Sequence, residues 1–227
     1  MASIRQVRAL ECDLMKTYNQ YCPIAHALDV VGERWALLII RELVEHDQLR
    51  YSDLHANLPG CGTNILAARL KELERNDVVR RRRLPPPAAS TVYELTEYGQ
   101  ELRPVLHMLA HWGARSLAPP TADTPLEPGW LPGALEMIFC PTPTDVRVEF
   151  RVGDDVASLA GGEVLEGAVD EPDVVVECDR AGFYRLIVHR DFADASIAGD
   201  EALVRTLIGS LPYGEPSPDA LSAATAA

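Results

Sequence analysis

Cationic and amide side chains gather between residues 63 and 83 in a spacing that suits binding rather than covalent chemistry. Lys71 and Arg75 stand four residues apart, and Arg80–Arg83 is an unbroken run of four arginines. Ammonium and guanidinium groups donate to phosphate oxygens, and the Asn64 amide can pair with an adenine edge. These residue types predict contact with double-stranded DNA. The alternative is an ordinary solvated helix face followed by a solvated basic hairpin.

Motifs for covalent catalysis are missing from the sequence, which contains no Walker-type glycine loop, GxGxxG, GxSxG or HExxH. His107 and His111 stand four residues apart, as two metal ligands on one helix can, but no third ligand is evident. We therefore interpret both as surface or interface histidines. The prediction is a binding protein, not an enzyme, with no cofactor.

The basic and amide residues require a helix that presents them on one face. Leu66, Leu70 and Leu73 recur at the spacing of a buried helical stripe, and Thr63 is the expected N-cap. The opposite face would enter a DNA groove, where alanines allow close approach to a thymine methyl group and longer cations reach phosphates. The candidate DNA-binding residues are Thr63, Asn64, Ala67, Ala68, Arg69, Lys71, Arg75, Arg81 and Arg83.

A short helix and a strand pair flank this helix. Residues 51–58 form the short helix, which a Pro-Gly pair ends. Residues 78–84 and 91–95 have strand propensity, and the Pro-rich segment 85–90 between them must turn. The order predicts a helix-turn-helix with a β-hairpin wing, whose arginine strand would lie along the phosphate backbone.

This arrangement resembles the HxlR-type winged-helix transcriptional regulators of bacteria. The resemblance rests on CPIAHALDVVGERW at 22–35, ALLIIREL at 36–43, RYSDL at 50–54, Leu66 with RLKELE at 69–74, and YELTEYG at 93–99. It covers about residues 12–117. The turn GCGTN at 60–64 departs from the Ile-Ser type sequence that is usual in the family, which leaves the base preference open.

The resemblance implies a homodimer on an inverted-repeat operator. Two apolar helices, residues 4–20 and 97–117, are expected to form the dimer interface. Pro104 either kinks the second of these or marks its first turn. Its apolar side, expected to be exposed, comprises Leu102, Val105, Leu106, Leu109 and Trp112.

Two more helices precede the helix-turn-helix. The first opens at Pro23, and its expected buried face is Ile24, Ala27, Leu28 and Val31. The second covers residues 35–45, with Trp35, Leu38, Ile39 and Leu43 as packing residues.

The net charge of -13 is unevenly distributed. Residues 1–118 carry 15 Lys+Arg against 14 Asp+Glu, whereas residues 119–227 carry 6 against 20. The acidic excess therefore belongs to the second half and does not oppose DNA binding by the first. We expect a winged-helix and dimerisation domain at 1–117, a Pro-rich linker at 118–129, a second domain at 130–213 and a disordered tail at 214–227.

The second domain is expected to combine a sheet with helices. Its expected strands are 144–152, 173–178 and 195–198, and its expected helices are 180–189 and 200–211. This order resembles the sterol carrier protein type 2-like fold, most clearly in SIAGD at 196–200. The resemblance implies a site for an apolar ligand, whereas a packing module is the alternative. The candidate pocket residues are Phe139, Phe150, Phe183, Leu186 and Ile187.

Five cysteines, none in a CxxC or zinc-ligand spacing, favour reduced thiols. Cys22 and Cys61 are redox candidates, because each precedes an expected helix and a helix N-terminus lowers a thiol pKa. The family resemblance implies the same of Cys22, since some HxlR-type relatives respond to thiol oxidants through the matching cysteine.

The expected fold class is α+β, with a winged helix-turn-helix domain followed by a sterol-carrier-like sheet-and-helix domain. We expect a cytoplasmic transcriptional regulator whose partners are double-stranded DNA and a second copy of itself, but no membrane. An apolar small molecule is the further partner that the sterol-carrier resemblance implies. The alternatives are a thiol-responsive regulator with a purely structural second domain, and a lipid carrier with a vestigial wing.

Overall fold

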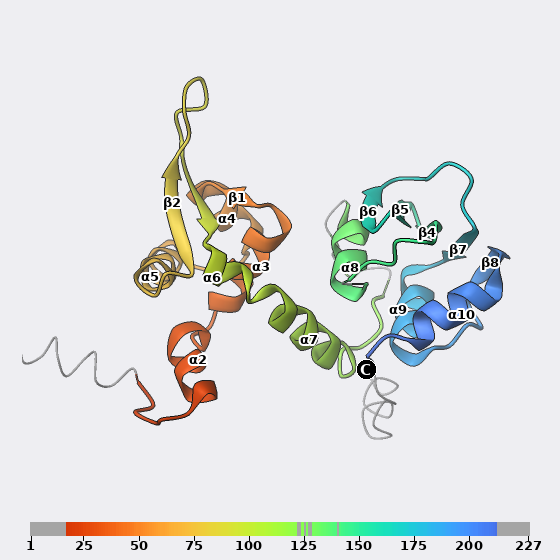
Figure 1. Ribbon diagram of the computed structural model, residues 1–227, viewed down its shortest axis with the longest axis horizontal. Coiled ribbons are helices and arrows are strands. Elements are labelled where there is room, and N and C mark those ends of the chain that lie inside the picture. Colours follow the sequence, from red (N-terminus) through yellow and green to blue (C-terminus); the bar gives the residue numbers. More distant parts are fainter. Residues whose placement is uncertain (1–16, 122–123, 125, 127–128, 140, 213–227) are drawn as a thin grey trace, which may run out of the picture. The chain divides into compact units, whose positions relative to one another are not determined.

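The computed structural model describes residues 17–121, 124, 126, 129–139 and 141–212. The chain divides into two compact units, residues 1–106 and 107–227 (Figure 1). The division was expected after residue 117 but falls within helix α7 (Arg103–Ala114). Leu106 packs in the core of the first unit, whereas Tyr184 of the second unit donates its hydroxyl to the carbonyl oxygens of Ala114 and Leu117. No helix among the described residues is long and apolar enough to cross a membrane.

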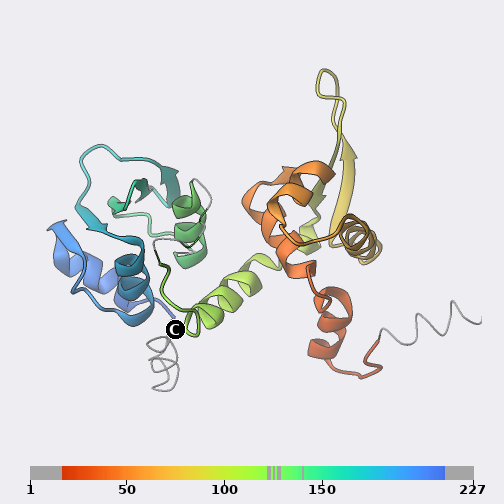
Figure 2. The same cartoon turned by 180° about the vertical axis from the view of Figure 1, so that it is seen from behind.

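The first unit is a set of helices beside a small antiparallel sheet. Its helices are α2 (Pro23–Val31), α3 (Ala36–Glu45), α4 (Tyr51–Asn57), α5 (Thr63–Arg75), α6 (Glu97–Gln100) and the first turn of α7. Its strands are β1 (Gln48–Leu49), β2 (Val79–Arg83) and β3 (Thr91–Leu95), in the order β1-β3-β2. The β2–β3 hairpin projects beyond the helices of its unit in both views (Figures 1 and 2).

The predicted helix-turn-helix and wing are present. Leu66, Leu70 and Leu73 are at most 1% exposed, so the stripe on α5 forms part of the core as expected. The N-cap of α5 is Gly62, one residue before the expected Thr63, and no side chain caps this end. The Tyr51 hydroxyl donates to the Thr63 carbonyl oxygen at 2.7 Å, which fastens the start of α5 to α4.

The expected helix over 97–117 is two helices. The Thr96 side chain caps α6 by accepting a hydrogen bond from Gly99 N at 3.0 Å, and α7 then begins at Arg103. Pro104 therefore lies in the first turn of α7, where its missing N–H costs no intrahelical bond. The expected exposure of Leu106 was wrong, since this residue is only 7% exposed.

The face of α2 that was expected to be buried lies mostly at the surface. Ile24 and Leu28 are 72% and 45% exposed, and Ala27 is exposed too, whereas Val31 and the unexpected Ala25 are buried. The expected burial was therefore wrong for three of the four residues, because no element in the described part of the chain covers this side of α2. On α3, Ile39 and Leu43 are buried as expected, whereas Leu38 is 40% exposed. The helix expected at 4–20 lies almost entirely outside the described residues.

The second unit is a five-stranded sheet with helices. Its strands are β4 (Val148–Val152), β5 (Asp155–Ala160), β6 (Glu163–Glu166), β7 (Val174–Cys178) and β8 (Ser196–Gly199), in the order β6-β5-β4-β7-β8. Its helices are α8 (Trp130–Ile138), α9 (Arg180–His189) and α10 (Glu201–Gly209). The β4–β7 pair is parallel and the other pairs are antiparallel. The mixed α+β class is therefore confirmed.

The expected strands and helices of this unit are present, with shorter ends. Asp200 caps α10 as expected, since its Oδ1 accepts from Leu203 N at 3.1 Å. Helix α8 was not expected, because a proline and a glycine interrupt its apolar pattern, and no strand had been expected at β5 or at the edge strand β6. The expected tail at 214–227 lies outside the described residues.

Candidate nucleic-acid interface

The exposed face of α5 carries most of the residues that the sequence singled out. Asn64, Ala67, Ala68, Lys71 and Arg75 are all exposed. Lys71 has no ion pair within the described residues, so its ammonium group is available to an anion. The small alanines at the centre allow another surface to approach the helix closely.

Arg69 differs from the other candidates. Its side chain is only 13% exposed, and its guanidinium contacts Glu72 Oε2 at 2.5 Å and Glu33 Oε2 at 3.2 Å. These contacts tie α5 to the segment that follows α2. Arg69 therefore helps to hold α5 in place. The helical pattern of α5 alone could not distinguish this role from a DNA contact.

The four arginines of β2 alternate between the two faces of the wing. Arg80 and Arg82 share one face with Glu94 of β3, whose two carboxylate oxygens accept from Arg80 Nε at 2.8 Å and Arg82 Nε at 2.7 Å. Gln48 of β1 completes this group by accepting from the Arg82 guanidinium at 2.7 Å. We call Arg80, Arg82, Glu94 and Gln48 the Glu94 group.

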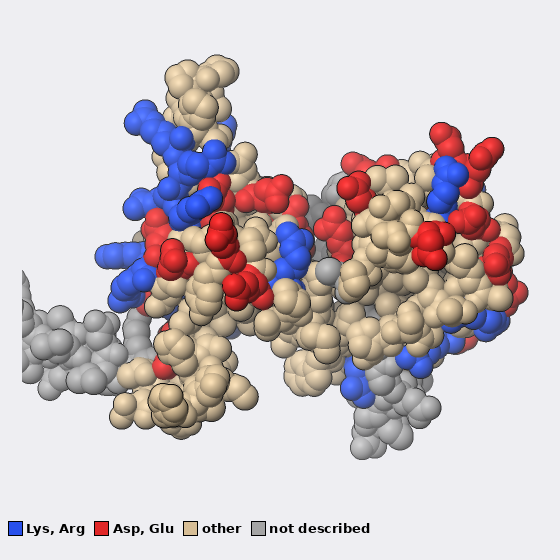
Figure 3. Space-filling model, viewed as in Figure 1, with Lys and Arg blue, Asp and Glu red and all other residues tan. Residues whose placement is uncertain are grey.

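The other face of β2 carries Arg81 and Arg83. Arg81 Nε donates to Glu74 Oε1 of α5 at 2.7 Å, which joins the wing to the recognition helix. Arg83 is exposed and has no ion pair within the described residues. Figure 3 shows Lys and Arg side chains gathered along the wing and α5. The two uncompensated cations of this surface are thus Lys71 and Arg83, one on each element.

Glu94 is held in its charged form. Burial raises the pKa of its carboxyl group, but the hydrogen bonds and charges of Arg82 and Arg80 outweigh that effect and lower the pKa below its ordinary value. The residue is 8% exposed, whereas the side chains of Arg80 and Arg82 remain 63% and 48% exposed. The buried Glu94 carboxylate therefore binds the Nε groups of two arginines whose side chains extend into solvent.

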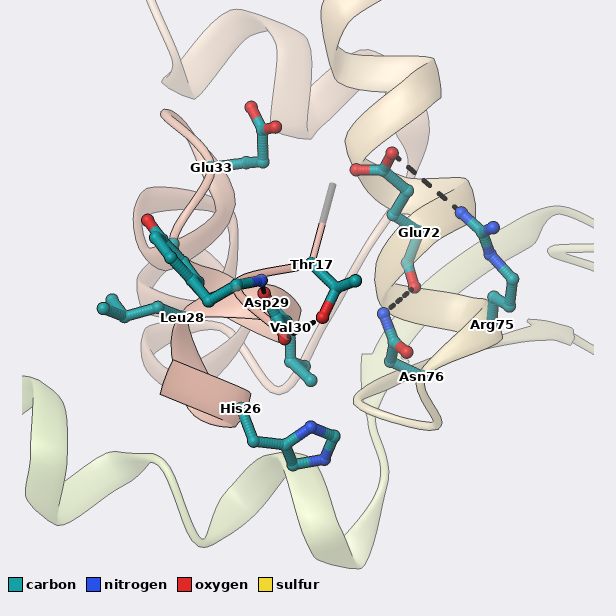
Figure 4. A pocket seen from close by; sticks show the side chains of 11 residues that line it. Thr17, His26, Leu28, Asp29, Val30, Glu33, Glu72, Arg75 and Asn76 are labelled. Carbon is teal, nitrogen blue, oxygen red and sulfur yellow. Dashed lines mark hydrogen bonds and ion pairs between the residues drawn. The ribbon is translucent and has the colours of Figure 1, made fainter. Parts of the chain in front are cut away.

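A groove of about 560 Å³ lies behind α5 in the same unit. Its walls come from α2, the residues just before α2, and the C-terminal end of α5 (Figure 4). Asp29 accepts from the Thr17 hydroxyl at 2.8 Å on one wall, and Asn76 donates to the Glu72 carbonyl oxygen at 3.0 Å on the other. No pattern in the sequence predicted this groove, because its walls are distant in the chain.

The two redox candidates lie in different surroundings. Cys22 is the N-cap residue of α2 and is partly exposed. Cys61 is 3% exposed, and burial raises the pKa of its thiol, which is opposite to the expected lowering. The expectation failed for Cys61 because desolvation of the thiolate outweighs any effect of the helix end.

The candidate ligand residues of the second unit form its core. Phe139, Phe150, Phe183, Leu186 and Ile187 are all at most 5% exposed, and the ring centroids of Phe150 lie 5.9 Å and 6.0 Å from those of Phe139 and Phe183. This packing matches the alternative of a packing module. His107 and His111 are both 6% exposed, so of the two expected positions, surface or interface, the surface position was wrong.

Helices α4 and α5 form a helix-turn-helix in which α5 exposes a basic face, and the β2–β3 hairpin carries the arginines. Together they define a winged helix-turn-helix DNA-binding domain. Residues 30–120 match the model of the HxlR-like helix-turn-helix family. The chain is 34% identical over 106 residues to the uncharacterized HTH-type transcriptional regulator YvaP of Bacillus subtilis, covering 46% of this chain and 97% of YvaP. The chain belongs to the HxlR-like family of helix-turn-helix transcriptional regulators.

A second relative is the HTH-type transcriptional regulator YodB of Bacillus subtilis, 34% identical over 102 residues, with 44% of this chain and 90% of YodB covered. The solved reduced form of YodB covers 45% of this chain and all of its own, at 33% identity and a TM-score of 0.39. The family model ends at residue 120, so the resemblance of the second unit to the sterol carrier fold stays a prediction.

Proposed function

We propose that this protein is a homodimeric transcriptional regulator that binds an inverted-repeat operator through α5 and the β2–β3 wing. The observation that carries the proposal is the exposed face of α5, where Asn64, Ala67, Ala68 and Lys71 stand free of the core. Asn64 lies near the start of the helix, where a recognition helix reads base edges. Lys71, Arg81 and Arg83 contact phosphates.

Dimerisation is supported by the apolar stripe on α7. Val105, Met108, Leu109 and Trp112 recur at i, i+3, i+4 and i+7 and are 43% to 70% exposed. A stripe of this size left open to water favours association with a second copy. Two-fold symmetry then sets half-sites about 10 bp apart, or a multiple of that spacing.

The test is selection from a pool of duplexes with a randomised central region, using the full chain. We expect enrichment of an inverted repeat. The variant Asn64→Ala should change the preferred bases, while Lys71→Gln should weaken binding to all sequences about equally. A pool with no enriched sequence after several rounds of selection would contradict the proposed mode of recognition. So would an unchanged preferred sequence with Asn64→Ala.

A thiol-responsive regulator is the second candidate, favoured by the partly exposed Cys22 at the start of α2. Oxidant treatment should then reduce operator binding by the native chain but not by Cys22→Ser. Equal loss of binding by both proteins would assign the response to another residue.

A further inference from the structure

Arg80 and Arg82 lie on the face of the wing opposite to Arg81 and Arg83. Successive side chains of a strand point to opposite faces, so Arg80 and Arg82 lie together on one face of β2. The register pairs Arg80 with Glu94 on β3, and Gln48 of β1 pairs with the same Glu94. One row of side chains thus crosses all three strands of the sheet.

The hydrogen bonds within this row fix the two guanidinium groups. Both arginines use Nε to bind Glu94, one at each carboxylate oxygen. An arginine has five N–H donors in a rigid plane, so a bond at Nε orients the other donors. Arg82 gives one of these to Gln48 Oε1, and the rest of its guanidinium N–H groups stay available to a phosphate. The Arg80 and Arg82 side chains are about half exposed or more, whereas the Glu94 side chain is 11% exposed.

We propose that the Glu94 group is a phosphate-binding site on the wing, in which Glu94 is the positioning residue and Arg80 and Arg82 bind the DNA backbone. This inference rests on the proposed function, since it assigns a second contact to the same DNA-binding unit. The group has a net charge of +1, because one carboxylate offsets one of two guanidiniums. Arginines held in advance lose less side-chain freedom when they bind a phosphate.

The role of Glu94 can be separated from simple charge because the two ideas predict opposite signs. If only net charge matters, Glu94→Gln makes the wing more positive and strengthens DNA binding. If Glu94 positions the arginines, the same substitution weakens binding despite the added positive charge. Glu97→Gln is the matched control: it removes an equal charge from an exposed residue nearby that makes no ion pair with the wing arginines in the described part of the chain.

The measurement is the affinity of the full chain for a 30-bp duplex of random sequence, by fluorescence anisotropy over a series of salt concentrations. A random duplex suffices because phosphate contacts do not depend on sequence. We expect Glu94→Gln to bind about fivefold more weakly, on the scale of a lost charge-assisted contact, and Glu97→Gln to bind as well as the native chain or better. Joint replacement of Arg80 and Arg82 by Gln should lower the log-log salt slope by about 1 to 2.

A mutant cycle completes the test. With Arg80 and Arg82 replaced by Gln, the further change Glu94→Gln should no longer weaken binding, because Glu94 positions only these two side chains. Tighter binding by Glu94→Gln, or an unchanged salt slope after loss of both arginines, would overturn the proposal. If the native chain binds no duplex at all, the proposed function fails instead. The fraction folded, measured by circular dichroism at the assay temperature, must be the same for every variant compared.

Discussion

At the scale of single residues, burial decides which cysteines can react. The Cys178 thiol has a pKa of about 12, raised by desolvation and by the nearby Asp179 carboxylate, and burial also raises the pKa of Cys61. The reactive species is the thiolate, whose population at pH 8 is therefore small at both positions.

We expect iodoacetamide at pH 8 to modify Cys22 much faster than Cys61 or Cys178, by a factor of about ten or more from thiolate fraction and access. The measurement uses variants that keep one cysteine each, followed by mass spectrometry over time. Urea-unfolded samples provide the control, since all three thiols should then react alike. Equal rates in the folded samples would mean that local opening, not burial, governs these thiols.

A second prediction at this scale concerns how the free energy of unfolding depends on pH. The folded-state pKa of Glu94 lies below its ordinary value of 4.5, so Glu94 stabilises the fold fully above that pH and progressively less as pH falls through the folded pKa. Urea unfolding of the native chain and of Glu94→Gln should therefore differ by a constant free energy above about pH 5, a difference that shrinks below about pH 4.5. A difference that grows on acidification would show that the two arginines do not stabilise the carboxylate.

At the scale of elements, close backbone contacts at Val78 join the wing to the helices. Thr96 N donates to the Val78 carbonyl oxygen at 3.1 Å, and a Cβ added to Gly99 would stand 2.1 Å from that same oxygen. Because the oxygen belongs to the backbone, it cannot move away as a flexible side chain could.

Gly99→Ala is therefore expected to destabilise the protein by about 2–3 kcal/mol, the scale of an overpacked interior. The helical Gly133 is the control, since a Cβ there meets nothing within 4 Å. Gly133→Ala should be neutral or stabilising by up to about 1 kcal/mol through helix propensity. Both values come from denaturant unfolding, and equal stability of the two variants would show that the wing junction adjusts easily.

At the scale of the whole molecule, the exposed stripe on α7 has a measurable consequence. Met108 and Leu109 are 59% and 43% exposed at the centre of that stripe. Replacing both by Asp would place two charges in a desolvated interface, so we expect dimers to dissociate to monomers at micromolar concentration. Sedimentation velocity measures the change.

The control for this prediction is Leu165→Asp, which puts a charge on an apolar residue that is 37% exposed on the edge strand β6. This variant should remain a dimer and keep its affinity for DNA. If the α7 variant also remains a dimer, the second copy binds elsewhere, and the exposed face of α2 becomes the next surface to substitute.

The sequence by itself determined the helix-turn-helix, the wing and the unequal charge of the two halves. Leu66, Leu70 and Leu73 could be read as buried because helical spacing is a local property, and the strands of the wing followed from residue type and a Pro-rich turn. The family motifs were likewise confirmed over residues 30–120. These signals are all carried by residues that lie close together in the chain.

Only the tertiary structure decided which polar groups meet. In the sequence, Arg69 and Arg81 cannot be told from unpaired arginines. In the structure, Arg69 forms ion pairs with Glu33 and Glu72, and Arg81 forms one with Glu74. Glu94 lies between two arginines because three strands align it with Gln48 and Arg80, which are 46 and 14 residues away in the chain. Strand register and helix packing set these pairings, and neither can be predicted from the spacing of residues close together in the chain. Burial of Cys61 follows from the same packing, which is why its expected low pKa was wrong.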